Sequence, residues 1–570
     1  MSGDSVSGRG ETGGGAGSRN SGDGRTRADR IADRAASARA TVLDRGASGL
    51  ASAIRSVQTA LARPTASDVA TIGCTLAIAL VVGSTLVGVG LAVLAVLAGL
   101  GAALVTVLLA SDRPLVRTLG GAIAVPVSVV FAAPAVLAGA LVATGGVEFF
   151  AGIAVWALVV AALASGLVSW KRLGNGGARR GATGTMLAST GVIAVVVLRV
   201  LPESAVHQRA GAAASAIGGA LWSVLVAADG SWALVWFVAL LFVTVVAVRL
   251  TLAYVPFERL LPPDRRDGLS TIIGTIQRAC SHVARLSVLL VLAAFAAPAV
   301  SDRLEDIPVS PSELAAELPA SVGVVLASVA TASPLRLGLL AVLGATASLA
   351  ALEWVRRTFK RNVALVVARL CAPAVGGAVV ATVLAVVLSD AVLAVEPAAE
   401  ISGTAPGPIV DLVAALPPLA LAAAVLVPAL GTLASALLGI STLRAIRLLP
   451  ARAIGGALAA GSVFALAVGL VAVGRIELAI ATAGGALVLW DVGEYADSIR
   501  TELGREADTI RAELVHVGGS LLSGAAVVSA VLAVYWAGVA QLSVADPAAA
   551  TVALGAGLLA VVLVAWALRA

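Results

Sequence analysis

Apolar residues occur along the chain in long runs that short polar segments separate. Many runs are about 18–22 residues long, the length that an α-helix needs to cross the hydrocarbon core of a bilayer. Within the runs, apolar and polar residues do not alternate as they do in the strands of an outer-membrane barrel. The pattern therefore predicts an all-α fold, a polytopic bundle of transmembrane helices.

Fourteen runs are predicted to cross the membrane. The first two come from one apolar stretch, 69–110, whose 42 residues are about twice the length of one crossing, so we expect a tight turn near Gly88–Gly90. Two further apolar pieces, 211–228 and 321–332, are interpreted as re-entrant or interfacial segments, with a sixteen-span fold as the alternative. The predicted spans are 69–88, 91–110, 119–143, 149–169, 184–200, 231–253, 286–300, 335–352, 363–388, 416–439, 453–473, 478–490, 518–540 and 548–568.

The distribution of Lys and Arg predicts the orientation of these spans, because both residues concentrate in short cytoplasmic loops. With the N-terminus inside, the inner loops hold 21 basic residues and the outer loops hold three, which are Arg209, Arg303 and Arg475. An error of one early span would reverse this bias. We therefore expect an even number of spans in the plasma membrane, with the N-terminus and the C-terminus both cytoplasmic.

The chain divides into three regions. Residues 1–24 are rich in Gly and Ser and are predicted to form a disordered tail. Residues 25–66 are basic and carry apolar residues at roughly helical spacing, which indicates either an amphipathic helix on the anionic inner leaflet or a solvated basic tail. Residues 67–570 form the transmembrane domain.

Composition agrees with this class of protein. Apolar residues make up 59% of the chain and charged residues 13%, whereas a soluble domain is about a quarter charged. The formal net charge is +6, which need not mean a nucleic-acid partner, and none is expected. The partner that the composition does require is the lipid bilayer.

The chain carries none of the residue patterns that mark catalytic, cofactor or metal sites. The three cysteines are far apart, the three histidines are isolated, and no phosphate-binding loop or catalytic triad pattern is present. The predicted spans hold no Asp or Glu, although ion-coupled carriers usually keep an ionisable group there. We expect no enzyme activity; the alternative is a metal-dependent membrane transferase using Asp302, Glu305 and Asp306 of an outer loop.

Four arginines lie in or against the predicted spans. Arg199, Arg249 and Arg336 are near span ends and are expected to extend towards the headgroups. Arg369 is about seven residues inside its span, roughly 10 Å deep at the rise of an α-helix, with Pro373 just beyond it. Arg369 either reaches the headgroups in the same way or binds a phosphate group of a lipid or substrate.

The most unusual segment is 491–517, a charged stretch between two predicted spans. It holds seven acidic residues and three arginines, and its apolar residues recur in steps of three and four, which predicts a cytoplasmic amphipathic helix. Its apolar stripe either packs on the protein's own cytoplasmic loops or binds a basic soluble partner. The candidate partner-binding residues are Ile499, Leu503, Ile510 and Leu514.

Three short motifs in and beside this segment resemble an uncharacterised family of haloarchaeal multi-pass membrane proteins: WDxGEY at 490–495, LGRE at 503–506 and ELVHxGGSL at 513–521. The close match covers about 30 residues. The resemblance implies no catalytic residues. It implies a genomic context, because such proteins tend to be encoded near a MoxR-type AAA ATPase and a protein with a von Willebrand-like domain.

Two functions follow as hypotheses. The first is a non-catalytic membrane component or scaffold that contacts a soluble partner, such as an AAA ATPase, through 491–517. The alternative is a transporter or flippase for a lipid-linked or small hydrophobic substrate, with Arg369 at its binding site.

Overall fold

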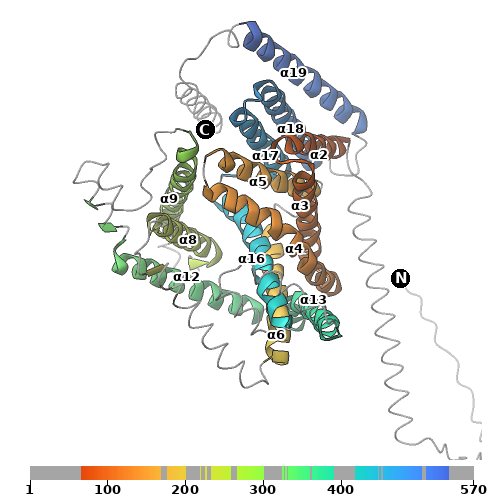
Figure 1. Ribbon diagram of the computed structural model, residues 1–570. Helices are drawn as coiled ribbons and strands as arrows, with labels where there is room; N and C mark the ends of the chain where they lie inside the picture. Colours follow the sequence, from red (N-terminus) through yellow and green to blue (C-terminus); the bar gives the residue numbers. More distant parts are fainter. Residues whose placement is uncertain are drawn as a thin grey trace, which may run out of the picture. The chain divides into compact units, whose positions relative to one another are not determined.

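The computed structural model describes residues 66–144, 146–168, 176–200, 233–257, 266–300, 331–359, 363–390, 418–446, 448–450, 453–502 and 509–537, with single positions between 219 and 226 and between 324 and 329. In this part of the chain the structure is helical and contains no strand (Figure 1). The main helices are α2 (Ala66–Val87), α3 (Val89–Leu109), α4 (Pro114–Thr144), α5 (Gly146–Leu167), α6 (Gly177–Val200), α8 (Ala233–Tyr254), α9 (Arg266–Val300), α12 (Ser333–Phe359), α13 (Val363–Asp390), α16 (Pro418–Ala445), α17 (Ile454–Ala472), α18 (Ile476–Glu502) and α19 (Ile510–Ala537).

The helices confirm the predicted all-α membrane fold. Twelve of those described are long and apolar enough to cross a membrane, and each of the first thirteen predicted spans lies on one helix in the predicted order. Gly88 separates α2 from α3 with a φ of 83°, a left-handed conformation that glycine adopts without strain. The fourteenth span, residues 1–65, most of 211–228 and half of 321–332 lie outside the described residues.

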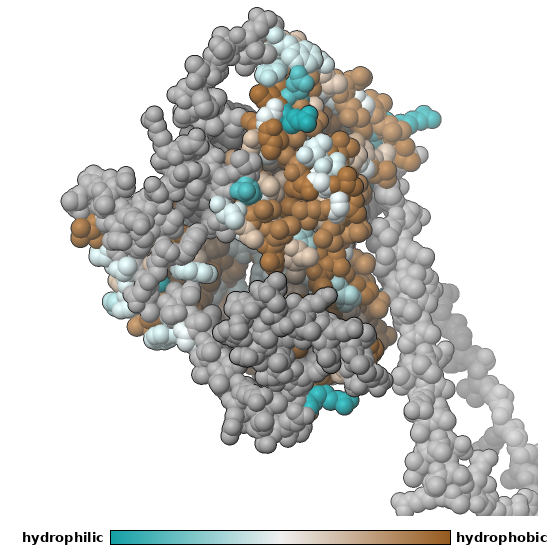
Figure 2. All heavy atoms as spheres, in the orientation of Figure 1, coloured by the Kyte–Doolittle hydropathy of each residue, from teal (hydrophilic) through white to brown (hydrophobic). Residues whose placement is uncertain are grey.

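The outer surface of the helices is apolar. Leu198, Leu522 and Val89 are 76%, 75% and 68% exposed, and apolar residues cover much of the helical face in Figure 2. Soluble monomers rarely expose apolar patches larger than a few hundred Å². Lipid chains are the medium in which such a surface is stable.

The centre of the core is built from α3, α5 and α17. In the apolar stretch of each of these helices, between 56% and 72% of the residues are buried. Small residues allow these backbones to approach closely, which supplies much of the cohesion between helices in a bilayer. A Cβ atom built on Gly99 of α3 would lie 2.3 Å from the carbonyl oxygen of Val159 in α5. Leu158, Leu466 and Leu470 fill the space between the helices and are fully buried.

α13 packs against both α4 and α6 through glycines. A Cβ on Gly121 of α4 would lie 2.3 Å from the carbonyl oxygen of Pro373, and one on Gly191 of α6 would lie 1.9 Å from that of Ala374. Pro373 has no N–H, so the carbonyl of Arg369, four residues earlier, lacks its usual helical partner. These contacts place Arg369 beside the first turns of α4 and α6.

α8 and α12 lie side by side and run parallel. Their first residues are joined by Arg336, which donates a 2.7 Å hydrogen bond to the carbonyl of Ala233. Their last turns are joined by Arg357, whose guanidinium lies 4.1 Å from the centre of the Tyr254 ring. A parallel pair in one membrane needs an odd number of crossings between its members, which agrees with the one span predicted between them, 286–300 on α9.

Arg336 corrects a prediction. It was expected to extend towards the headgroups, but its side chain is 0% exposed and is held by carbonyl groups at the start of α8 and just before it. The prediction was wrong because it considered only the distance of Arg336 from the end of its own helix. Arg199, in contrast, is exposed in the last turn of α6.

The segment 491–517 also differs from the prediction. It is not a separate helix: its first part continues α18 to Glu502, Thr509 is not helical, and its last part opens α19 at Ile510. The described acids of this segment therefore lie on the end portions of two apolar helices: Asp491, Glu494, Asp497 and Glu502 on α18, and Glu513 on α19. The prediction separated them from the spans because it placed span ends where charge begins.

Candidate functional site

The described residues of the motif region, 490–502 and 509–521, lie where α18 and α19 contact each other and the neighbouring helices α17 and α2. α18 and α19 form an antiparallel hairpin, since Trp536 donates to Glu477 at one end and Ser520 donates to Asp491 nearer the other. Gly493 is the point where α18 crosses α17. A Cβ atom on Gly493 would lie 2.9 Å from the Cα of Gly456, so neither position accepts a larger residue without moving a helix.

Polar side chains join α18 to α19 at this level. The hydroxyl of Ser520 donates a hydrogen bond to Oδ2 of Asp491, and Nε2 of His516 lies 3.1 Å from the same oxygen. The histidine contact has the distance of an ion pair but is not aligned as a hydrogen bond. The Tyr495 ring stacks on the His516 ring with centroids 3.7 Å apart. Four motif residues therefore hold the hairpin together.

Two further acids of the motif region bind the N-termini of neighbouring helices. Glu513 is 1% exposed; its Oε2 accepts hydrogen bonds of 3.0 Å from both the backbone N–H and the hydroxyl of Ser67, in the first turn of α2. Asp497 accepts a 3.1 Å bond from the backbone N–H of Ala453, which precedes α17. Carboxylates are favourable there because the first N–H groups of a helix are unpaired and the helix dipole is positive.

The apolar stripe of 491–517 was interpreted either as internal packing or as a surface that binds a soluble partner, and its two halves differ in exposure. Val492 and Ala496 are 3% and 2% exposed, so this half of the stripe is internal packing. Of the four candidate partner-binding residues, Ile499 is half-buried and Leu503 lies outside the described residues. The remaining two, Ile510 and Leu514, are 56% and 58% exposed on the first turns of α19.

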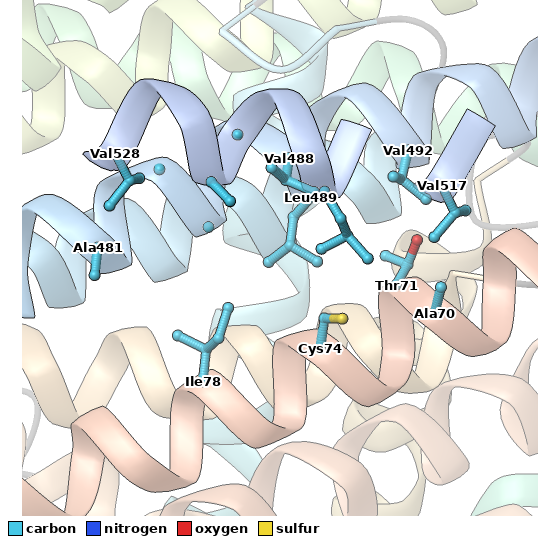
Figure 3. Close-up of a pocket in the computed structure, with 15 residues that line it drawn as sticks. Ala70, Thr71, Cys74, Ile78, Ala481, Val488, Leu489, Val492, Val517 and Val528 are labelled. Carbon is cyan, nitrogen blue, oxygen red and sulfur yellow. The ribbon is translucent and has the colours of Figure 1, made fainter. Parts of the chain in front are cut away.

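A pocket of about 270 Å³ lies between α2, α18 and α19 (Figure 3). Its walls are apolar side chains such as Ile78 and Val488, together with Gly484 and Gly524. The hydroxyl of Thr71 is its most polar group, and that hydroxyl already donates to the carbonyl of Ser67. The pocket has the chemistry to hold an apolar chain; its lining includes the thiol of Cys74 but no carboxylate, histidine, lysine or arginine side chain.

Arg369 does not line this pocket. Its Nε donates a 2.9 Å hydrogen bond to the carbonyl of Asp112, in the turn between α3 and α4. The described residues contain no group of three His, Cys, Asp or Glu side chains that could hold a metal ion. The outer-loop acids Asp302, Glu305 and Asp306 lie outside the described part of the chain.

The sequence alone did not identify Glu513 as an interhelical group or Ser67 as its partner. A carboxylate three or four residues into an apolar helix indicates that the group is bonded to a partner, because burial of an unpaired carboxylate is unfavourable. The sequence does not indicate which residue is that partner, since Ser67 is 446 positions away.

These features define the class of protein: a multi-pass helical membrane protein in which charged side chains of the motif region join neighbouring helices. Comparison with known families adds one finding. Residues 404–565 match the model of a family of unknown function, DUF7519, and this range contains the whole motif region. None of the curated proteins and none of the solved structures matches the chain.

Proposed function

We propose that the protein is a non-catalytic component of an assembly in the plasma membrane, and that it holds a soluble partner at the charged end of the α18–α19 hairpin. The observation that carries this proposal is the contrast at the start of α19. Glu513 is buried and bound to α2, while Ile510 and Leu514 on the same turns are more than half exposed. A fixed helix end that presents two large apolar side chains is suited to binding a protein.

The charge of this end favours a basic partner surface. The segment 491–517 carries seven acids against three arginines, and among its described residues Glu494 and Glu502 are exposed. Complementary charge speeds association and selects partners. The resemblance to haloarchaeal membrane proteins encoded near a MoxR-type ATPase makes an AAA ATPase the first partner to test.

The test is a pull-down from native membranes in mild detergent with the full chain. The test variant is Ile510→Ser with Leu514→Ser. The matched control is Leu115→Ser, because Leu115 has the same 56% exposure in the first turn of another helix, α4. We expect a soluble partner to be retained by the wild type and the control and lost from the double variant.

Retention of the partner by the double variant, or the absence of any specific partner, contradicts the proposal. A second expected result is release of the partner as the salt concentration rises from 0.05 M towards 1 M, because the Debye screening length falls from about 14 Å to about 3 Å over that range.

The alternative function is a transporter or flippase for a lipid-linked substrate. A second observation favours it: Arg369 stands among other arginines rather than alone. Reconstituted vesicles that move a fluorescent lipid between leaflets would support this alternative, provided that Arg369→Gln abolishes the movement.

A further inference from the structure

Three arginines from three helices meet where α4, α6 and α13 begin. Asp112 joins two of them: its carboxylate lies 3.8 Å from the guanidinium of Arg180, and its carbonyl accepts the bond from Nε of Arg369. The third is Arg117, one turn into α4. Its guanidinium is repelled by the charges of Arg180 and Arg369 and attracted by that of Asp112.

The cluster has more positive charge than its protein surroundings balance. Three guanidinium groups face one carboxylate among the described residues, which leaves an excess of two positive charges. The Nε of Arg117 is buried, and no described residue accepts a hydrogen bond from it. The N-termini of α4 and α6 add the positive ends of two helix dipoles. An anion bound here would satisfy Arg117 and remove the repulsion.

The helix packing fixes this arrangement. α13 contacts α4 and α6 through glycines at backbone distance, one to three turns from the arginines. The three guanidinium groups therefore need little reorganisation to bind a ligand together. Guanidinium forks bind phosphate oxygens in pairs of parallel hydrogen bonds, which suits a phosphate group better than a halide or a single carboxylate.

The surroundings favour a phosphate that is attached to an apolar chain. Arg369 lies six residues after Val363, the first residue of α13, which is about 9 Å along an α-helix. Large apolar side chains of α13 are exposed on both sides of Arg369 along the helix: Leu365, one turn before it, is 42% exposed, and Val375, further along, is 51% exposed. Lipid tails along these side chains would bring a headgroup to the level of the arginines.

We infer that Arg117, Arg180 and Arg369 form a binding site for the phosphate group of an anionic phospholipid. The site shares no residue with the α18–α19 hairpin and is independent of the proposed function.

The test is native mass spectrometry of the purified full chain in detergent, with phosphatidylglycerol, phosphatidylcholine or inorganic phosphate added in turn. The wild type is expected to bind phosphatidylglycerol in preference to phosphatidylcholine. Arg117→Gln and Arg369→Gln should each weaken phosphatidylglycerol binding by about tenfold or more, the usual effect of losing a hydrogen bond to a charged group. Arg475→Gln, in the turn between α17 and α18, should change nothing.

Asp112→Asn provides a test of opposite sign that does not depend on a destabilised variant. It removes the one carboxylate and keeps the backbone carbonyl that binds Arg369, so phosphatidylglycerol binding should become tighter. Equal binding of phosphatidylglycerol by the wild type, Arg117→Gln and Arg369→Gln, or no tighter binding in Asp112→Asn, overturns the inference. Binding of inorganic phosphate without a preference between the two lipids would assign the cluster to a soluble phosphate and overturn the lipid part.

Discussion

The contact between Glu513 and Ser67 allows a quantitative test of how the motif region is held. Glu513→Gln keeps the size of the side chain and removes its charge. In the wild type the carboxylate accepts two bonds from Ser67, both 3.0 Å, and a third of 2.6 Å from the hydroxyl of Thr509. Hydrogen bonds to a charged group contribute about 1.5–3 kcal/mol, and neutral ones about 0.5–1.5 kcal/mol.

The loss of charge from the two Ser67 bonds should therefore cost about 2 kcal/mol, with up to about 1 kcal/mol more from the lost interaction with the α2 dipole. Ser67→Ala removes one bond and should cost about 1.5 kcal/mol alone but only about 0.5–1 kcal/mol in the presence of Glu513→Gln. The control is Glu502→Gln, an exposed acid at the end of α18, which should stay within about 0.5 kcal/mol of the wild type.

Stability is measured by titrating SDS into mixed micelles and following intrinsic tryptophan fluorescence to obtain the free energy of unfolding. One result would refute the reasoning: unchanged or greater stability in Glu513→Gln. It would mean that desolvation of the buried carboxylate outweighs its hydrogen bonds, as happens in some buried ion pairs. Additive effects of the two substitutions would refute the assigned pairing.

Two other features lead to direct predictions. Gly191→Ala places a Cβ atom 1.9 Å from a carbonyl oxygen of α13 and should destabilise the protein by about 1–3 kcal/mol in the same SDS titration. The control is Gly439→Ala, which has no atom within 4 Å of its Cβ and should be neutral or stabilise the protein by up to about 1 kcal/mol. Equal effects of the two substitutions would contradict the described packing of α6 against α13. Cysteines that replace Thr251 and Thr346, in a variant without the native cysteines, should cross-link α8 to α12 on oxidation because the Thr251 hydroxyl lies 3.4 Å from the Thr346 carbonyl. The cross-link is read as a band shift on non-reducing gels. If cysteines that replace Thr251 and Ser333 cross-link instead, the two helices are not parallel.

Most of the helical architecture follows from the sequence, for a local reason. The length of an apolar run decides whether a helix can cross the bilayer, so thirteen helices lie where the runs predict them. The turn at Gly88 is equally local, because its positive φ of 83° favours glycine. These features depend only on residues that are close together in the chain.

The tertiary structure alone decided the roles of the charged residues, because their partners are far away in sequence. Glu513 is internal since Ser67, 446 positions earlier, brings the first turn of α2 against it. Arg336 is buried because the start of α8 lies beside it, and Arg369 joins a cluster because glycine packing places α13 against α4 and α6. A hydropathy pattern predicts which residues enter the membrane, but the satisfaction of a charge there depends on which helices pack together.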